Sequence, residues 1–530
     1  MTEFGGINGA ESIIRAALLS GLDTCFANPG TTEIPLVRAL DEIEGVRPVL
    51  CLFEGVCTGA ADGYGRMANR PALTLLHLGP GLANGVAYLH DARRARSPVV
   101  NLIGEHATWH QAADAPLQSD IESLARPVSA WLRRGAVSTE LARDLQDAII
   151  AASVKPGRIS TLILPHDLLI APGLLPGAPP RLPDPPRICS ERIATARDAL
   201  LNGSPAAILL GSHALRERAQ PALARIRELT GVGLIAEAFP ARWERGLGRP
   251  AISRLPYFPE MAVPVLARYQ TIILAGAPSP VSFFGYPGTP SHYITADQQT
   301  IDLAGPEDDV ETALEELAES LQVRGGKSSS PALDKPSSTD FPSLDPDRPL
   351  TGRRMTAIVA ALLPPGAIVM DEGHTSTGAH TAYFQQAAPH SYLTQPGGAI
   401  GLGMPCAIGA AIACPDRPVV TLQADGSGMY TVQSLWTMAR EGLNIKTIIC
   451  NNSGYQIVGI EMLRAGVTSP GGRARSLMDV VGPQIDWVGV SKGLGVPAVR
   501  VETTTQLADV LRRELLEPGP FLIDAVLEKE

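Results

Sequence analysis

The sequence has few cysteines, and none of them form a Cys-x-x-Cys pair. Its seven cysteines, an odd number, stand singly in apolar surroundings, as Cys25 and Cys450 do. This pattern argues against a disulfide framework or a paired-thiol metal site, and it favours buried, reduced thiols. A reducing compartment is therefore expected.

Long apolar runs and an excess of positive charge are also missing. No run of about 18 apolar residues would cross a membrane, and the first residues lack the basic and apolar regions of a secretory signal. The formal net charge is −10, which argues against a basic, nucleic-acid-binding face. We therefore expect a cytoplasmic protein that binds neither membrane nor nucleic acid.

The chain does have length and apolar content. Its 530 residues are 45% hydrophobic and 18% charged, which is enough for about three domains with large cores. Short apolar runs alternate with helical patterns, as in the strands expected at Val49–Phe53, Ala72–Leu76 and Pro98–Ile103 and the helix expected at Leu82–Ala95. This alternation predicts an α/β fold of doubly wound parallel sheets.

Two segments of unusual composition divide the chain. Residues 171–186 are rich in proline, and residues 324–347 are rich in Ser, Pro and Asp. Both are typical of linkers. The sequence therefore predicts domains at residues 1–170, 188–322 and 351–530, with a flexible linker at 323–350.

Polar residues follow two expected strands of the third domain, Pro418–Gln423 and Lys446–Cys450. Asp425 comes directly after the first strand, and Asn452, 27 residues later, follows the second. In a strand-helix-strand unit this spacing can place both at the carboxyl ends of neighbouring strands, where open α/β sheets bind ligands. A carboxylate, an amide oxygen and a nearby main-chain carbonyl suit Mg²⁺ that also holds phosphate.

This Asp-Gly-Ser turn with its paired Asn resembles the metal-diphosphate motif of thiamine diphosphate (ThDP) enzymes. The family usually has glycine where this chain has Ala424, a replacement of small by small. The resemblance implies that Asp425, Asn452 and the carbonyl of Gly454 hold Mg²⁺. It also implies that Gly426 and Ser427 contact the diphosphate.

Glu54 ends an apolar strand and precedes a helix rich in Gly and Ala. By itself it could be a helix-start carboxylate favoured by the macrodipole. The segment Phe53–Tyr64, however, resembles the pyrimidine-binding segment of ThDP enzymes. The resemblance implies that Glu54 hydrogen-bonds the aminopyrimidine ring of the cofactor and activates it.

Over nearly its full length the chain resembles the branch that contains benzoylformate decarboxylase and acetolactate synthase. The resemblance implies pyrimidine-binding, central and diphosphate-binding domains, in that order. Thr31 stands where that decarboxylase has a serine on the substrate side, and His77 matches its proton-relaying histidine. The stretch 276–286 matches the place of its second histidine but contains phenylalanine, and His292 is the nearest histidine. This departure argues against simple benzoylformate decarboxylation.

Further segments match the family around the cofactor. Thr375 and Ser376 are candidates for contact with the diphosphate, while His374 beside them could reach the site or lie in a surface loop. By the match, the Gly398 carbonyl receives the 4′-amino group and Ile400 is the apolar wedge that bends the cofactor.

A loop of the first domain carries further polar residues. His106 and His110 have the spacing of a zinc face, but a loop at the rim of the cleft is favoured. Gln118 resembles a glutamine near the substrate of acetolactate synthases, which supports a carboligase.

Together these motifs imply ThDP- and Mg²⁺-dependent decarboxylation of a 2-oxo acid. The resulting carbanion/enamine would be protonated to an aldehyde or ligated to a second carbonyl. Two alternatives stand beside this function: an acetolactate synthase-type carboligase and a catalytically degenerate family member. The resemblance also implies a site between the Glu54 domain of one subunit and the Asp425 domain of another. A homodimer would then be the minimum, and a homotetramer the usual case.

Overall fold

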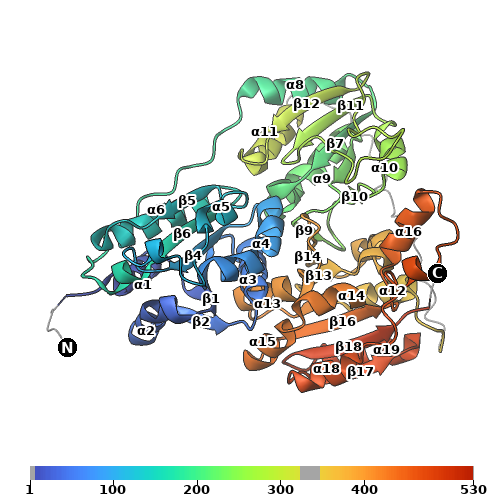
Figure 1. Ribbon diagram of the computed structural model, residues 1–530. Helices are drawn as coiled ribbons and strands as arrows, with labels where there is room; N and C mark the ends of the chain where they lie inside the picture. The colour runs from blue at the N-terminus through green and yellow to red at the C-terminus, as the bar shows by residue number, and fades with distance from the viewer. Residues whose placement is uncertain (1–5, 323–346, 529–530) are drawn as a thin grey trace.

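The computed structural model describes residues 6–322 and 347–528, and most of the linker expected at 323–350 lies outside them. Three sheets, each built mainly of parallel strands, form an N-terminal unit (residues 6–170), a central unit (188–322) and a C-terminal unit (347–528). In Figure 1 the blue N-terminal unit lies beside the orange C-terminal unit, and the green central unit lies above both. The predicted α/β class of doubly wound sheets is confirmed.

The N-terminal unit contains a six-stranded parallel sheet with the order β2-β1-β3-β4-β6-β5. Its strands are β1 (Thr24–Asn28), β2 (Arg47–Leu50), β3 (Ala72–Leu76), β4 (Val99–Glu105), β5 (Trp131–Arg134) and β6 (Ile159–Pro165), and its main helices are α1 (Gly9–Leu19), α2 (Ile34–Glu42), α3 (Glu54–Ala68), α4 (Leu78–Ala95) and α6 (Leu141–Ser153). Every residue of β3, β4 and β6 is buried, which explains their nearly continuous apolar sequence.

Two boundaries in this unit differ from the expected ones. The strand expected at Val49–Phe53 is β2, which ends at Leu50, and the helix expected from Leu82 starts at Leu78. Pro80 fits inside the first turn of α4, because the backbone N–H groups of a first turn have no intrahelical partner. His77 is consequently the residue that caps this helix.

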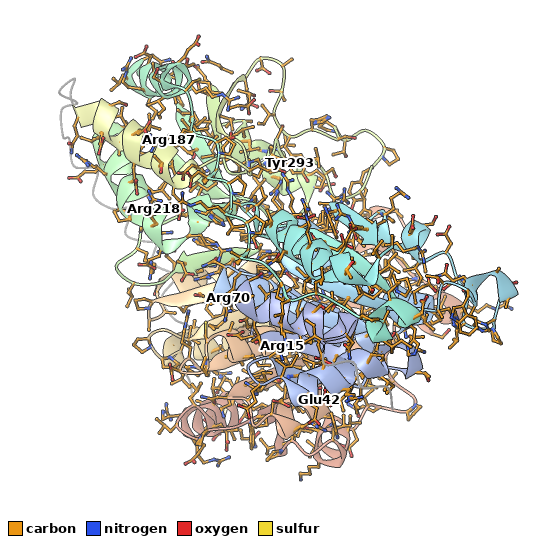
Figure 2. All side chains as sticks on the ribbon, turned by 90° about the vertical axis from the view of Figure 1, so that its left-hand side faces the viewer. Arg15, Glu42, Arg70, Arg187, Arg218 and Tyr293 are labelled. Carbon is orange, nitrogen blue, oxygen red and sulfur yellow. The ribbon has the colours of Figure 1, made fainter. Side chains whose placement is uncertain are left out.

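The central unit has a five-stranded parallel sheet with the order β10-β8-β7-β11-β12. Its strands are β7 (Ala206–Leu210), β8 (Gly233–Ala236), β10 (Ser253–Arg254), β11 (Thr271–Ala275) and β12 (Gln299–Ala304), and its main helices are α8 (Ser190–Leu201), α9 (Gln220–Thr230), α10 (Pro259–Leu266) and α11 (Val310–Gln322). Tyr293, labelled in Figure 2, and Glu237 line a cavity of about 790 Å³ whose opposite wall includes Arg96 and Arg126 of the N-terminal unit.

The C-terminal unit has a seven-stranded sheet with the order β17-β18-β16-β15-β13-β14-β9. Its strands are β13 (Ile368–Glu372), β14 (His390–Leu393), β15 (Val419–Ala424), β16 (Ile445–Asn451), β17 (Ala498–Val501) and β18 (Phe521–Val526), and its helices include α12 (Gly352–Leu362), α13 (Gly403–Ala413), α14 (Asp425–Gly428), α15 (Ser434–Arg440), α16 (Gln456–Arg464), α18 (Trp487–Gly493) and α19 (Thr504–Glu514). The seventh strand, β9 (Arg242–Arg245), comes from the middle of the chain and pairs antiparallel with β14.

The N-terminal and C-terminal units share one hydrophobic core, with α3 packed on α13. A Cβ on Gly59 would lie 2.6 Å from Pro405, and a Cβ on Gly63 would lie 2.0 Å from the carbonyl oxygen of Cys406. The glycines of α3 therefore allow close approach to a helix of the same chain. Among the described residues, no helix combines the length and apolar character required to cross a bilayer.

Candidate active site

The loops after β15 and β16 bring Asp425 and Asn452 together, as their spacing predicts. The two strands pair in parallel, with Ala424 opposite Cys450. The Asp425 carboxylate accepts a hydrogen bond from the backbone N–H of Ser453 at 2.6 Å, and the Asn452 side-chain oxygen accepts one from the N–H of Gly454 at 3.1 Å. The turn expected at 424–428 is the short helix α14, and α15 follows only at Ser434.

The electrostatics of this edge fit a bound cation. Burial raises the pKa of Asp425 to about 6, although backbone N–H groups of Gly426, Ser453 and Gly454 act in the opposite direction. A nearby cation would stabilise the charged form of such a buried carboxylate. The described residues contain no cluster of three or more His, Cys, Asp or Glu side chains that could hold a metal. One carboxylate with an amide and a main-chain oxygen instead suits Mg²⁺ that shares its coordination with phosphate.

Thr375 lies beside this edge, and a glutamine that we did not anticipate joins the two. The Gln456 side-chain oxygen accepts hydrogen bonds from the Thr375 hydroxyl at 3.1 Å and from the Asn452 amide at 3.3 Å. Ser427 instead interacts locally, accepting a bond from Gln423 at 2.7 Å. Ser376 is buried. No helical spacing signals this contact, because α16 begins only at Gln456 and Asn452 lies in the loop before it.

The segment expected to bend the cofactor has a glycine-dependent backbone. Gly398 has φ of 77°, in the left-handed region that favours glycine. The Ile400 carbonyl accepts a bond from the Tyr88 hydroxyl at 3.2 Å, and the buried Glu372 accepts one from the N–H of Gly401 at 2.5 Å. His374 Nε2 lies 3.6 Å from the same carboxylate. Burial acts to lower the pKa of His374, but the carboxylates of Glu372 and Asp371 together raise it above its usual value.

Glu54 is the first residue of α3, and it is only 9% exposed. Its carboxylate accepts a hydrogen bond from the Asn84 amide at 3.0 Å. Asn84 lies on α4, one turn before the Tyr88 that contacts Ile400. Helix α4 thus joins the predicted activating acid to the predicted bending segment. Asn84 escaped sequence reasoning because no local pattern links it to a residue 30 positions earlier.

His77 faces the loop that carries Thr31. Its Nδ1 lies 2.7 Å from a carboxylate oxygen of the fully buried Glu33 and 3.4 Å from the Thr32 hydroxyl. A Cβ on Gly30 would lie 2.3 Å from the same nitrogen. Thr31 is exposed on this chain, and Thr32 is the hydroxyl beside His77. A carboxylate on Nδ1 orients the ring and leaves Nε2 for a substrate.

Three further histidines and an aromatic loop residue were singled out by the sequence. The rings of His106 and His110 lie 5.5 Å apart, edge to face. His292 lies in the central unit, bridged to Val281. The Phe283 ring is 3.2 Å from the position that a Cβ on Gly398 would occupy. Phenylalanine therefore lies against the bending segment.

Comparisons with known proteins agree with this arrangement. Residues 7–125 match the family described as "Thiamine pyrophosphate enzyme, N-terminal TPP binding domain", and residues 373–525 match its "C-terminal TPP binding domain". The chain is 44% identical over 525 residues to "Putative acetolactate synthase large subunit IlvX" of Mycobacterium tuberculosis, covering 98% of this chain and 99% of that protein.

Two further similarities span the chain. It is 29% identical over 541 residues to benzoylformate decarboxylase of Pseudomonas aeruginosa, covering 95% of this chain and 96% of that protein. The solved structure of a thiamine diphosphate-dependent 4-hydroxybenzoylformate decarboxylase from Rhodococcus jostii RHA1 superimposes with a TM-score of 0.86 at 23% identity, covering 99% of both chains. At 23% identity, the likeness to this solved structure concerns the fold alone.

Proposed function

Because the chain belongs to the thiamine pyrophosphate enzyme family, we propose that it decarboxylates a 2-oxo acid with Mg²⁺ and thiamine diphosphate. Its acyl-derived product is either an aldehyde or the adduct with a second carbonyl compound. The observation that carries the proposal is the placement of Asp425 and Asn452 at the ends of two paired strands, where the Ser453 N–H donates to Asp425 at 2.6 Å and joins the two strand-end loops. Thiamine diphosphate is the cofactor of the family.

Residues of the C-terminal unit would hold the cofactor. Asp425, Asn452 and the Gly454 carbonyl would bind Mg²⁺, and the diphosphate would contact Gly426, Ser427, Thr375 and Ser376. Gly398 and Ile400 would support the bent conformation. When bound, the cofactor supplies a nucleophilic carbon that adds to the 2-oxo group and accepts the electrons released with CO₂.

Two groups of the N-terminal unit would move protons. Glu54 would share a proton with the pyrimidine ring, and Asn84 would orient its carboxylate through the 3.0 Å bond. His77 would exchange a proton with the substrate through Nε2, while Glu33 holds Nδ1 at 2.7 Å.

Carboligation is the second candidate outcome. The higher identity is to the protein named as an acetolactate synthase, at 44% against 29% for the decarboxylase. Phe283, which cannot donate a proton, lies against Gly398. Fewer proton donors at this wall favour transfer to a second carbonyl over protonation.

A second copy of the chain would complete the site. Large apolar side chains of both terminal units are exposed on the single chain, among them Trp109 at 78% and Leu477 at 81%. Burial of such groups in an interface is favourable, and this supports a homodimer at least and a homotetramer as the usual case. The seven free thiols support a cytoplasmic location.

Calorimetry and product analysis test the function. We expect thiamine diphosphate to bind only when Mg²⁺ is present, and we expect CO₂ from pyruvate or benzoylformate. Glu54→Ala should abolish turnover and leave Mg²⁺-dependent binding largely intact, whereas Glu42→Ala on the exposed face of α2 should change neither. Binding of thiamine diphosphate that does not depend on Mg²⁺, or full activity of Glu54→Ala, would refute the proposal. Acetolactate from pyruvate would select the carboligase.

A further inference from the structure

Helix α16 follows the predicted metal loop, and each of its nine residues is at least partly exposed. Burial of an apolar face, which fixes most helices, therefore contributes little here. Polar contacts hold its two ends instead. Gln456 at the first position contacts Thr375 and Asn452, and Arg464 at the last position contacts the central unit.

Arg464 is surrounded by two aromatic rings and two carboxylates. Its guanidinium carbon lies 4.0 Å from the ring centroid of Tyr286 and 4.6 Å from that of Phe258. Its terminal nitrogens lie 2.5 Å from Glu260 and 3.5 Å from Glu461. The Tyr286 hydroxyl also donates to Glu461 at 3.1 Å. A planar guanidinium can stack flat on rings and pair with carboxylates through its edge at the same time, which the compact ammonium of lysine cannot do in this geometry.

The contacts continue from Arg464 to the bending segment through the aromatic loop (residues 280–288). Ring centroids lie 6.5 Å apart for Tyr286 and Phe284 and 5.7 Å apart for Phe284 and Phe283. Phe283 in turn lies against Gly398. Because Phe283 and Phe284 are 41% and 55% exposed, burial alone does not fix the loop. Phe283 also packs against the ring of Tyr257 at 5.2 Å, and Tyr257 lies 4.8 Å from the Phe258 ring that Arg464 covers. Arg464 is therefore connected to Phe283 along two paths, through Tyr286 and through Phe258.

We propose that Arg464 is a positioning residue that sets substrate specificity: it clamps the aromatic loop so that Phe283 forms the wall facing the substituent of the 2-oxo acid. The inference rests on the proposed function, since that function places the reacting atoms beside Gly398. A substrate with a large flat substituent depends on this wall, whereas pyruvate, with its methyl group, does not reach it.

Arg464→Lys tests the proposal, because lysine keeps the charge and loses the planar stack. We expect kcat/KM for benzoylformate to fall about tenfold, mostly through KM, and kcat/KM for pyruvate to stay within about twofold. Arg133→Lys is the matched control, since Arg133 also stacks on a ring, that of Trp131 at 5.1 Å, and pairs with Asp144 and Asp147. This control should leave the ratio of the two kcat/KM values unchanged.

Two further measurements separate positioning from folding. Phe283→Leu should also lower the ratio of kcat/KM for benzoylformate to kcat/KM for pyruvate, because it shortens the wall itself. Hydrogen exchange of residues 280–288 should quicken in Arg464→Lys, while Mg²⁺-dependent thiamine diphosphate affinity stays within about twofold. Equal losses on both substrates, or unchanged exchange in the aromatic loop, would overturn the proposal. The exchange measurement needs no turnover, so a wild type inactive on both acids would refute the proposed function alone.

Discussion

Glu33 organises the loop that faces the substrate side of the site. It is fully buried and accepts hydrogen bonds from the Gly30 N–H at 2.7 Å and from the Thr32 hydroxyl at 2.6 Å, besides its contact with His77. A Cβ on Gly104 would lie 1.5 Å from its oxygen, so the neighbouring strand leaves room for this carboxylate. Glu33, which contacts His77, is thus itself held in place by hydrogen bonds.

Glu33→Gln keeps the size of the side chain and removes its charge. We expect kcat to fall about tenfold or more, because the His77 ring loses the charged acceptor that orients it for proton transfer, and an amide has one oxygen where the carboxylate has two. Steady-state kinetics and Mg²⁺-dependent calorimetry would separate this loss from one of cofactor binding, which should be unchanged. A wild-type kcat in the variant would show that His77 needs no such partner.

Glu237 makes the stability of the chain depend on pH. Burial raises its pKa from 4.5 to about 7, although Arg96 and the Ser212 N–H act in the opposite direction. The folded state therefore holds this proton more tightly than the unfolded state, and stability is lost as pH rises from about 4.5 through 7. Between pH 5 and pH 8, Glu237→Gln should gain about 2 kcal/mol relative to wild type.

Urea titrations of both proteins at the two pH values measure this difference. Glutamine cannot ionise, so its curve lacks the loss that the carboxylate causes. Two curves that remain parallel across the range would show that Glu237 stays ionised or solvated in the fold.

Helix α4 connects parts that the sequence separates by some 300 residues. Its cap is His77, its second turn contacts Glu54 through Asn84, and Tyr88 donates to the Ile400 carbonyl. The 397–401 segment is therefore positioned from the N-terminal unit and, through Phe283, from the central unit. Its backbone conformation is the point on which all three units converge.

Gly398→Ala tests the importance of that conformation. A side chain at φ of 77° costs about 1 kcal/mol of stability, and its Cβ would also press on Phe283. Gly442→Ala is the matched control, because Gly442 has φ of 61° with open space around it. Both variants should lose similar stability in urea, but only Gly398→Ala should weaken thiamine diphosphate binding, by about tenfold. Equal affinities in the two variants would contradict the assigned role.

The sequence predicted those elements whose signals are local. β3 spans the residues expected for it, Ala72–Leu76, because buried parallel strands are apolar runs bounded by polar turns. The placement of Asp425 and Asn452 at neighbouring strand ends was predictable, because strand ends follow directly from such runs. Asn84, Gln456 and the role of Glu33 depend on contacts between distant segments, which no periodicity encodes. β9 is too short and polar to be recognised as a strand of a distant sheet.

At the scale of the whole molecule, exposed apolar groups predict self-association. Trp109→Ala should raise the subunit dissociation constant about tenfold, because large aromatic side chains dominate interfaces. Sedimentation velocity over a dilution series measures this change, and specific activity should fall in parallel as subunits separate. Glu42→Ala, which removes an exposed charged side chain of α2 and no apolar surface of this kind, is the control. A fully active monomer at every concentration would show that one chain suffices.

Strand β9 limits how the central unit can be exchanged between related proteins. It belongs by sequence to the stretch between α9 and α10, and its Trp243 is buried in the core of the central unit, yet its backbone closes the edge of β14 in the C-terminal sheet. A chimera joined at the two linkers would bring β9 of one relative to the sheet of another. If the two strands did not pair, the edge of β14 would be exposed and prone to aggregation. An exchange between relatives should therefore transfer β9 and β14 from the same protein.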